Sequence, residues 1–259
     1  MYHSVDEAPS RAARGLSVAP VAFAEQMGVL ADRGFEPVTT ARLAAAWRAP
    51  ARVPLPRRPV LITFDDGYES VHRHALPVLA RHGFASTLFV STGWLRGPYD
   101  TGGGLDTMLD WDQVRRLAAG QVEIGGHSHT HPQLDQLADA TLDFELRHCA
   151  EIIAAELGTR PVSFAYPYGY SDRRVRAAVR AAGFAQSLAV GNGLARRRQG
   201  PYALQRITVR RATGTEEFGR LVEGHAIGRA FAGDRALTKA YALVRRARQI
   251  RRKAIGTRV

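Results

Sequence analysis

Short apolar runs alternate along the chain with longer stretches in which apolar residues recur every three or four positions. The short runs are typical of buried strands and the longer stretches of amphipathic helices. The predicted strands are 60–64, 86–90, 122–124, 163–166, 186–190 and 207–209. The predicted helices are 17–34, 40–47, 71–82, 110–119, 139–157, 171–182 and one that begins at Thr215. Thr40, Asp110 and Ser171 are the expected N-caps, since their side chains can accept from the first turn.

This alternation of strands and helices predicts an α/β fold. Parallel neighbours need a crossover connection, and a helix is the usual one. Six or seven such units favour a (β/α) barrel with parallel strands, either closed or incomplete, in which the active site lies at the carboxyl ends of the strands. Residues 91–109 are rich in glycine and show no periodicity, which predicts a long functional loop.

The positive charge is concentrated near the end of the chain. Hydrophobic residues make up 45% of the sequence, enough for a globular core, and the net charge is +12. Residues 234–259 contain nine Lys or Arg and one Asp. We therefore expect a catalytic domain over 1–225, a basic helical tail over 226–259, and no nucleic-acid partner.

The tail has an apolar face. Leu237, Tyr241, Val244 and Arg248 fall on one side of the predicted helix, and many Arg residues surround them. Such a helix is typical of contact with an anionic membrane or an anionic substrate, and the alternative is a terminal helix packed on the barrel.

Cysteine content and hydropathy bear on the compartment. The single cysteine, Cys149, excludes an internal disulfide and fits a reducing compartment. The first residues do not form a signal peptide, and no apolar stretch has transmembrane length. As written, the sequence predicts a soluble cytoplasmic protein that the tail could bring to a membrane.

Two polar segments follow predicted strands. Asp65 and Asp66 come directly after strand 60–64, and His127 and His131 follow strand 122–124. Two imidazoles and one carboxylate form a metal site with open positions that suits Zn²⁺, with Co²⁺ and Ni²⁺ as alternatives. The second carboxylate can then act as a base on water. The simpler interpretation of both segments is a polar surface turn.

Three motifs resemble those of polysaccharide deacetylases, carbohydrate esterase family four. They are Thr63-Phe64-Asp65-Asp66-Gly67, His127-Ser128-x-x-His131-Pro132 and Phe164-Ala165-Tyr166-Pro167-Tyr168-Gly169. The resemblance extends over residues 2–218 and is strongest to an exopolysaccharide-deacetylase-like subgroup. It implies a distorted, incomplete (β/α) barrel and metal-dependent removal of N-acetyl groups from an amino-sugar-containing polysaccharide or glycoconjugate.

The resemblance also implies a role for each site residue. Asp65 would be the catalytic base, and the Tyr168 backbone N–H would line the oxyanion hole. The metal ligands would be Asp66, His127 and His131. The family often has an arginine that orients the base where this chain has Ala165, so the sequence does not show how Asp65 is held.

The general acid is less clearly marked. Tyr2-His3 is similar to the opening motif of the subgroup, which implies that His3 is the acid, and His225 is the weaker alternative. Relatives usually carry several apolar residues before this motif, so a start upstream of Met1, and with it an exported form, remain open.

Other functions stay open at this stage. A related amidohydrolase acting on a non-sugar C–N amide bond would use the same residues. A non-catalytic binder of an anionic polymer has no need for all four metal and base residues, and an Fe²⁺ redox enzyme would consume oxygen. The sequence does not determine the sugar, its chain length or linkage, the native metal or the oligomeric state.

Overall fold

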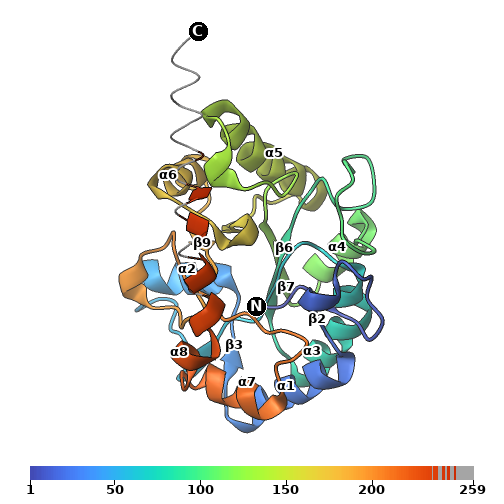
Figure 1. Cartoon of the computed structure of the whole chain (residues 1–259), viewed down its shortest axis with the longest axis vertical. Helices are drawn as coiled ribbons and strands as arrows, with labels where there is room; N and C mark the ends of the chain where they lie inside the picture. The colour runs from blue at the N-terminus through green and yellow to red at the C-terminus, as the bar shows by residue number, and fades with distance from the viewer. Residues whose placement is uncertain (235, 239–240, 243, 246–247, 249–259) are drawn as a thin grey trace.

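Five parallel strands form a curled half-barrel at the centre of the computed structural model (Figure 1). They are β5 (Thr63–Phe64), β6 (Ser86–Val90), β7 (Val122–Gly126), β8 (Ser163–Ala165) and β9 (Gln186–Leu188). Their order in the sheet follows their order in the chain, and every neighbouring pair is parallel. The structure describes residues 1–234, 236–238, 241–242, 244–245 and 248. The order and parallel direction of the five strands confirm the predicted incomplete (β/α) barrel.

Helices surround the strands (Figure 1). They are α1 (Pro20–Asp32), α2 (Thr40–Arg48), α3 (Leu76–His82), α4 (Trp111–Ala118), α5 (Asp139–Leu157), α6 (Arg173–Ala181), α7 (Thr215–Val222) and α8 (Ile227–Ala230). The short helical turns are η1 (Arg14–Leu16), η2 (Val71–Ala75), η3 (Leu134–Gln136), η4 (Pro167–Gly169) and η5 (Arg197–Gln199). Their apolar faces cover the sheet, and the largest buried cluster joins side chains of the strands and of α1, α3, α4 and α5.

Chain segments outside the sheet extend both of its edges. Beside β5, the Tyr2 N–H donates to the Thr63 carbonyl at 2.8 Å, and the Asp65 N–H donates to the Tyr2 carbonyl at 3.0 Å. Beside β9, Leu204 forms a parallel bridge with Leu188. Tyr2 thus runs parallel to β5, and the residue that follows it is directed to the same end of the barrel as Asp65.

Two small parallel sheets lie outside the barrel. Strand β1 (Ser4–Val5) pairs with β2 (Ser17–Val18), and β3 (Glu36–Pro37) pairs with β4 (Pro59–Val60). The apolar periodicity predicted a helix that begins at Ser17. Because residues 17–18 are extended, α1 instead begins at Pro20. Each of these strands has two residues, too few to show an alternating pattern in the sequence.

The predicted helix starts need two corrections. The α2 N-cap is Thr39, whose hydroxyl accepts from the Arg42 N–H at 3.2 Å, and not Thr40. The α6 N-cap is Asp172, which accepts from the Val175 N–H at 2.7 Å, and not Ser171. In both cases two adjacent residues have capping side chains, and periodicity does not choose between them. Asp110 caps α4 as predicted.

The predicted strand 207–209 is not formed. This segment instead pairs with the first residue of the chain: the Met1 N–H donates to the Ile207 carbonyl at 2.9 Å, and the Val209 N–H donates to the Met1 carbonyl at 3.0 Å. Of the three residues only Val209 is buried, and the segment is too irregular to count as a strand.

The described part of the C-terminal region packs on the body in two places. In α8, Ile227 is buried against Leu221 of α7. Further on, Arg245 forms an ion pair with Asp135 at 2.5 Å, and its guanidinium lies 3.5 Å from the centre of the Tyr170 ring. Leu237 is 72% and Val244 45% exposed, which leaves these two side chains accessible. Contact of this face with a membrane stays a prediction. Residues 249–259 of the predicted tail lie outside the described part of the chain.

No helix among the described residues combines the length and the apolar character that crossing a bilayer requires.

Candidate metal centre and active site

Three side chains from two loops meet at the carboxyl ends of β5 and β7. The Asp66 Oδ1 atom lies 3.3 Å from His127 Nε2 and 3.4 Å from His131 Nε2, and the ligand atoms of all three residues lie within 4.8 Å of one another. Two ligands bound to one Zn²⁺ at about 2.1 Å in tetrahedral geometry are about 3.4 Å apart. The spacing therefore fits a single ion between the three residues.

The buried polar atoms of the group also fit a metal ion. Asp66 Oδ1 is buried and has no hydrogen-bond partner among the described residues. The His127 Nδ1–H donates to the Ala165 carbonyl at 2.7 Å, which leaves the Nε2 lone pair directed at the other two ligands. This bond to the Ala165 carbonyl fixes the His127 tautomer that metal binding needs.

Burial and neighbouring charges together set the pKa values of the three ligands. Burial raises the pKa of Asp66, but the adjacent His127 imidazole and the other nearby imidazoles outweigh burial and hold that pKa far below its usual value. Burial lowers the pKa of His127, yet the adjacent Asp66 and Asp65 carboxylates leave it raised overall. Burial and the neighbouring His127 lower the pKa of His131 to about 4, so its ring is neutral and able to bind a cation at pH 7.

Asp65 is held by an arginine from the far end of the chain. The Arg206 Nη1 and Nη2 atoms donate to Asp65 Oδ1 and Oδ2 at 2.6 and 2.7 Å, a bidentate pair in which both side chains are buried. Burial raises the pKa of Asp65, but the charge and hydrogen bonds of Arg206 outweigh it, so the pKa is lowered overall. Arg206 thus keeps Asp65 ionised and oriented in a site where burial alone would favour its neutral form.

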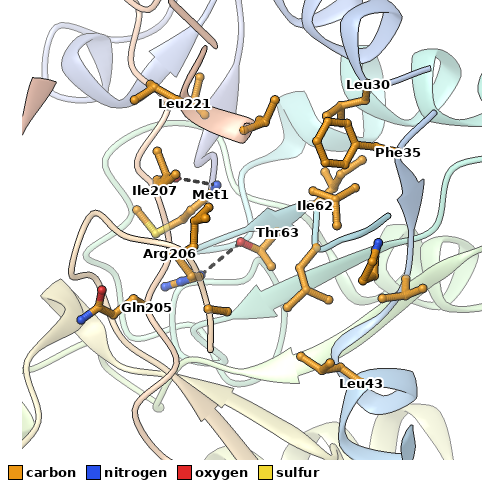
Figure 2. A pocket seen from close by; sticks show the side chains of 18 of the residues that line it. Met1, Leu30, Phe35, Leu43, Ile62, Thr63, Gln205, Arg206, Ile207 and Leu221 are labelled. Atoms are coloured by element: carbon orange, nitrogen blue, oxygen red, sulfur yellow. Dashed lines mark hydrogen bonds between the residues drawn. The ribbon is translucent and has the colours of Figure 1, made fainter. Parts of the chain in front are cut away.

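The Arg206 side chain lines an apolar pocket of about 440 Å³ (Figure 2). Leu30, Phe35 and Ile62 line the same pocket, and Arg206 also donates from Nη1 to the Thr63 hydroxyl at 3.3 Å. The apolar walls limit screening of the Arg206–Asp65 pair by water. Sequence reasoning missed this residue, and its only local signal is a charged residue directly before the apolar segment 207–209.

The two candidate acids are in different surroundings. His3 follows Tyr2 beside β5, and Asp66 and Asp65 both influence its titration. Burial lowers the pKa of His3, while these carboxylates oppose the shift, and its Nδ1 has no hydrogen-bond partner in the described part of the chain. His225 is exposed beyond the end of α7, where its backbone N–H donates to the Arg220 carbonyl.

Aromatic rings border the metal group. The Trp94 ring lies 4.5 Å from that of His131, and the Tyr168 ring lies 4.8 Å from it on η4. Tyr168 is 53% exposed, whereas Trp111 is buried in the core. Trp94, carried on the long loop after β6, therefore lies beside the metal group, whereas Trp111 is part of the core. His129 makes contacts away from the group, with Thr92 and His148.

Four site residues have left-handed backbone conformations that side chains other than glycine rarely adopt. The φ angles are 75° at Asp66, 68° at Ser128, 60° at His131 and 59° at Tyr168. The long loop and the histidine loop also approach closely, since the Gly93 N–H donates to the His129 carbonyl at 2.8 Å. A Cβ on Gly93 would lie 2.8 Å from that oxygen, so only glycine fits there.

The amino-acid sequence is similar to those of polysaccharide deacetylases. The family model described as polysaccharide deacetylase matches residues 52–187. YxkH of Bacillus subtilis (strain 168) is 27% identical over 224 residues, which cover 86% of this chain and 75% of that protein. The poly-beta-1,6-N-acetyl-D-glucosamine N-deacetylase of Escherichia coli (strain K12) is 32% identical over 136 residues, 49% of this chain and 20% of that enzyme.

Solved structures share the fold. The Streptococcus pyogenes deacetylase PplD, in complex with acetate, has a TM-score of 0.75 at 21% identity, with 86% of this chain and 96% of that chain covered. IcaB from Ammonifex degensii has a TM-score of 0.68 at 24% identity and covers 86% of this chain and 94% of its own. At these identities the likeness establishes the common architecture alone.

Proposed function

Since the chain belongs to the polysaccharide deacetylase family, we propose that it is a metal-dependent hydrolase that removes N-acetyl groups from an amino-sugar polysaccharide. The observation that carries the proposal is the pairing of two units at one end of the barrel. One is the Asp66, His127 and His131 group, and the other is Asp65, adjacent to it and held ionised by Arg206. A hydrolase needs both a place for an electrophile and a base oriented toward water.

Zn²⁺ suits a site of two imidazoles and one carboxylate, and Asp66, His127 and His131 would hold it. When bound, such an ion polarises the acetamide carbonyl and makes a water molecule more acidic. Asp65 accepts the proton of the attacking water as the water oxygen bonds to the carbonyl carbon, and the amide C–N bond breaks when this tetrahedral adduct collapses. The Tyr168 backbone N–H donates to the oxygen that gains charge.

The leaving amine needs a proton, and His3 is the donor we assign. A lowered pKa makes protonated His3 a stronger acid than a free imidazolium, while the neighbouring carboxylates favour its taking up a proton. The products are acetate and the free amino sugar. Tyr168, which is exposed, and Trp94, which is partly buried, both lie beside His131, where aromatic rings are suited to stacking on a sugar ring.

Acetate release tests the function. Purified protein should release acetate from oligomers of N-acetylglucosamine, and a chelator should lower the rate by more than about a hundredfold because the ion supplies several kcal/mol of charge stabilisation. Added Zn²⁺ should restore it. The same chelator saturated with Zn²⁺ beforehand is the control. Full activity in free chelator would contradict the mechanism, and hydrolysis of small non-sugar amides alone would favour the amidohydrolase alternative.

The general acid can be assigned with a matched pair of variants. His3→Gln is expected to lower kcat by about a hundredfold, the lower end of what a lost proton donor costs. His225→Gln should leave kcat within about twofold of the unchanged protein, since this side chain is exposed beyond α7. Substrates with a leaving group that needs no protonation should recover most of the His3→Gln loss. The opposite ranking of the two variants would assign the role to His225.

A further inference from the structure

The two histidines of the metal group are held in different ways. The His127 ring is fixed by its bond to the Ala165 carbonyl at 2.7 Å. The Nδ1 atom of His131 is buried and has no hydrogen-bond partner among the described residues, and its ring packs against those of Trp94, His127 and Tyr168. The position of His131 therefore depends on the backbone that carries it.

That backbone is bent twice within four residues. Ser128 and His131 both have left-handed φ angles, of 68° and 60°, which cost free energy in residues other than glycine. Such a conformation persists only where surrounding contacts stabilise it. One of these contacts is local, from the His131 N–H to the Ser128 hydroxyl at 3.0 Å.

The other contacts converge on one carboxylate. Glu145 Oε2 accepts from the His129 and Thr130 backbone N–H groups, each at 2.8 Å, and Glu145 Oε1 accepts from the Thr130 hydroxyl at 2.5 Å. Together with the Ser128 contact, these bonds occupy three successive backbone N–H groups between the two bends. The residues directly before His131 are thus held by hydrogen bonds to a single side chain, that of Glu145.

Glu145 is an unusual residue for its position. It lies in the middle of α5, is only 4% exposed, and takes part in none of the ion pairs formed by the described residues. A buried carboxylate without a cation is costly unless hydrogen bonds replace its hydration. The three donors of the histidine loop supply those bonds, so the loop and Glu145 stabilise each other.

We propose that Glu145 is a positioning residue for the metal centre, which sets the loop conformation that brings His131 Nε2 to 3.4 Å from Asp66 Oδ1. The inference rests on the proposed function only in that this group binds a metal ion. A carboxylate is suited to the task because all its lone pairs accept, whereas a glutamine would direct an NH₂ group at one of the same donors.

Metal affinity of Glu145→Gln tests the proposal directly. Metal-free full-length protein is titrated with Zn²⁺ in competition with a chromophoric chelator. We expect the Zn²⁺ Kd to rise about 10- to 100-fold, the range seen when a partner of a metal ligand is lost. Glu151→Gln, an exposed change on the same helix, is the matched control and should leave the Kd unchanged.

A purely structural role is distinguished by the same measurement. If Glu145 served only to stabilise the fold, Glu145→Gln would lower Tm but bind Zn²⁺ with unchanged Kd well below that Tm. That result would overturn the proposal, as would an unchanged Kd in Thr130→Val, which removes one of the three donors. Should Glu145→Gln fail to fold, Glu145→Asp keeps the charge, shortens the reach and should weaken Zn²⁺ binding.

The readout is independent of the reaction catalysed. Zn²⁺ binding by the unchanged protein that weakens in the Glu145 variants supports the inference even if no acetyl sugar is hydrolysed. Conversely, activity on acetyl sugars together with a Glu145→Gln variant of unchanged Kd would uphold the proposed function and refute the role of Glu145.

Discussion

Replacement of Asp65 by asparagine is expected to lower kcat for acetate release by about 10³-fold at saturating Zn²⁺, within the range that general-base catalysis contributes. Asparagine has nearly the same shape but cannot accept the proton of the attacking water. The neighbouring ligands Asp66, His127 and His131 are unchanged, so Zn²⁺ affinity should stay within about threefold of the original. Acetate assays and metal titration on the same preparation measure both quantities.

The Asp65→Asn experiment needs one structural control. Asparagine leaves the buried Arg206 guanidinium without a counter-charge, and breaking a buried ion pair typically costs about 3–5 kcal/mol of stability. The assay temperature should therefore lie below the Tm of the variant, as measured by circular dichroism. A folded Asp65→Asn protein that kept more than a tenth of kcat would show that another group deprotonates the water.

Replacement of Arg206 by methionine should give the second large effect, on both stability and rate. The Asp65 carboxylate would stay buried without its partner, so we expect a loss of about 3–5 kcal/mol in the free energy of unfolding. Loss of the bidentate bonds also frees Asp65 to rotate, and a misplaced base costs about a hundredfold in kcat. Arg206→Lys keeps the charge but not the paired geometry, and should be intermediate.

The pH profile distinguishes orientation from charge in the Arg206 variants. Arg206 lowers the pKa of Asp65 against the effect of burial, so without it that pKa rises. Because the base must be ionised, the acid limb of kcat/KM should move to higher pH in Arg206→Met and move less in Arg206→Lys. Arg210→Met, which breaks an exposed pair with Asp234, is the control and should shift neither limb. An unshifted limb in Arg206→Met would contradict this electrostatic role.

The sequence predicted the elements whose signals are local. Strand β6 and helix α5 have the predicted bounds, because each has an unbroken apolar pattern and ends at a glycine or a turn. The metal group could be predicted because its ligands follow two strands that a parallel barrel brings to one end. Whether these residues act as assigned stays a prediction until the variants above are measured.

The missed parts depend on pairings across the whole chain. Arg206 is 141 residues from Asp65, and with 36 Lys and Arg in the sequence no single arginine stands out. The resemblance showed that Ala165 stands where an orienting arginine is common in the family, but it did not show which residue orients Asp65 instead. Glu145 was similarly hidden, since a glutamate on a long helix ordinarily faces solvent.

The left-handed residues Asp66, Ser128, His131 and Tyr168 have a consequence for engineering the enzyme. These four positions store conformational strain that the folded body tolerates. Selection of variants for heat resistance alone would favour glycine at these positions, or a different turn, because either relieves the strain. Such variants would lose the side chains or the geometry of the site and would be less active. Substitutions at these positions that raise Tm are therefore expected to lower kcat, and a screen for a more stable enzyme has to select for stability and activity together.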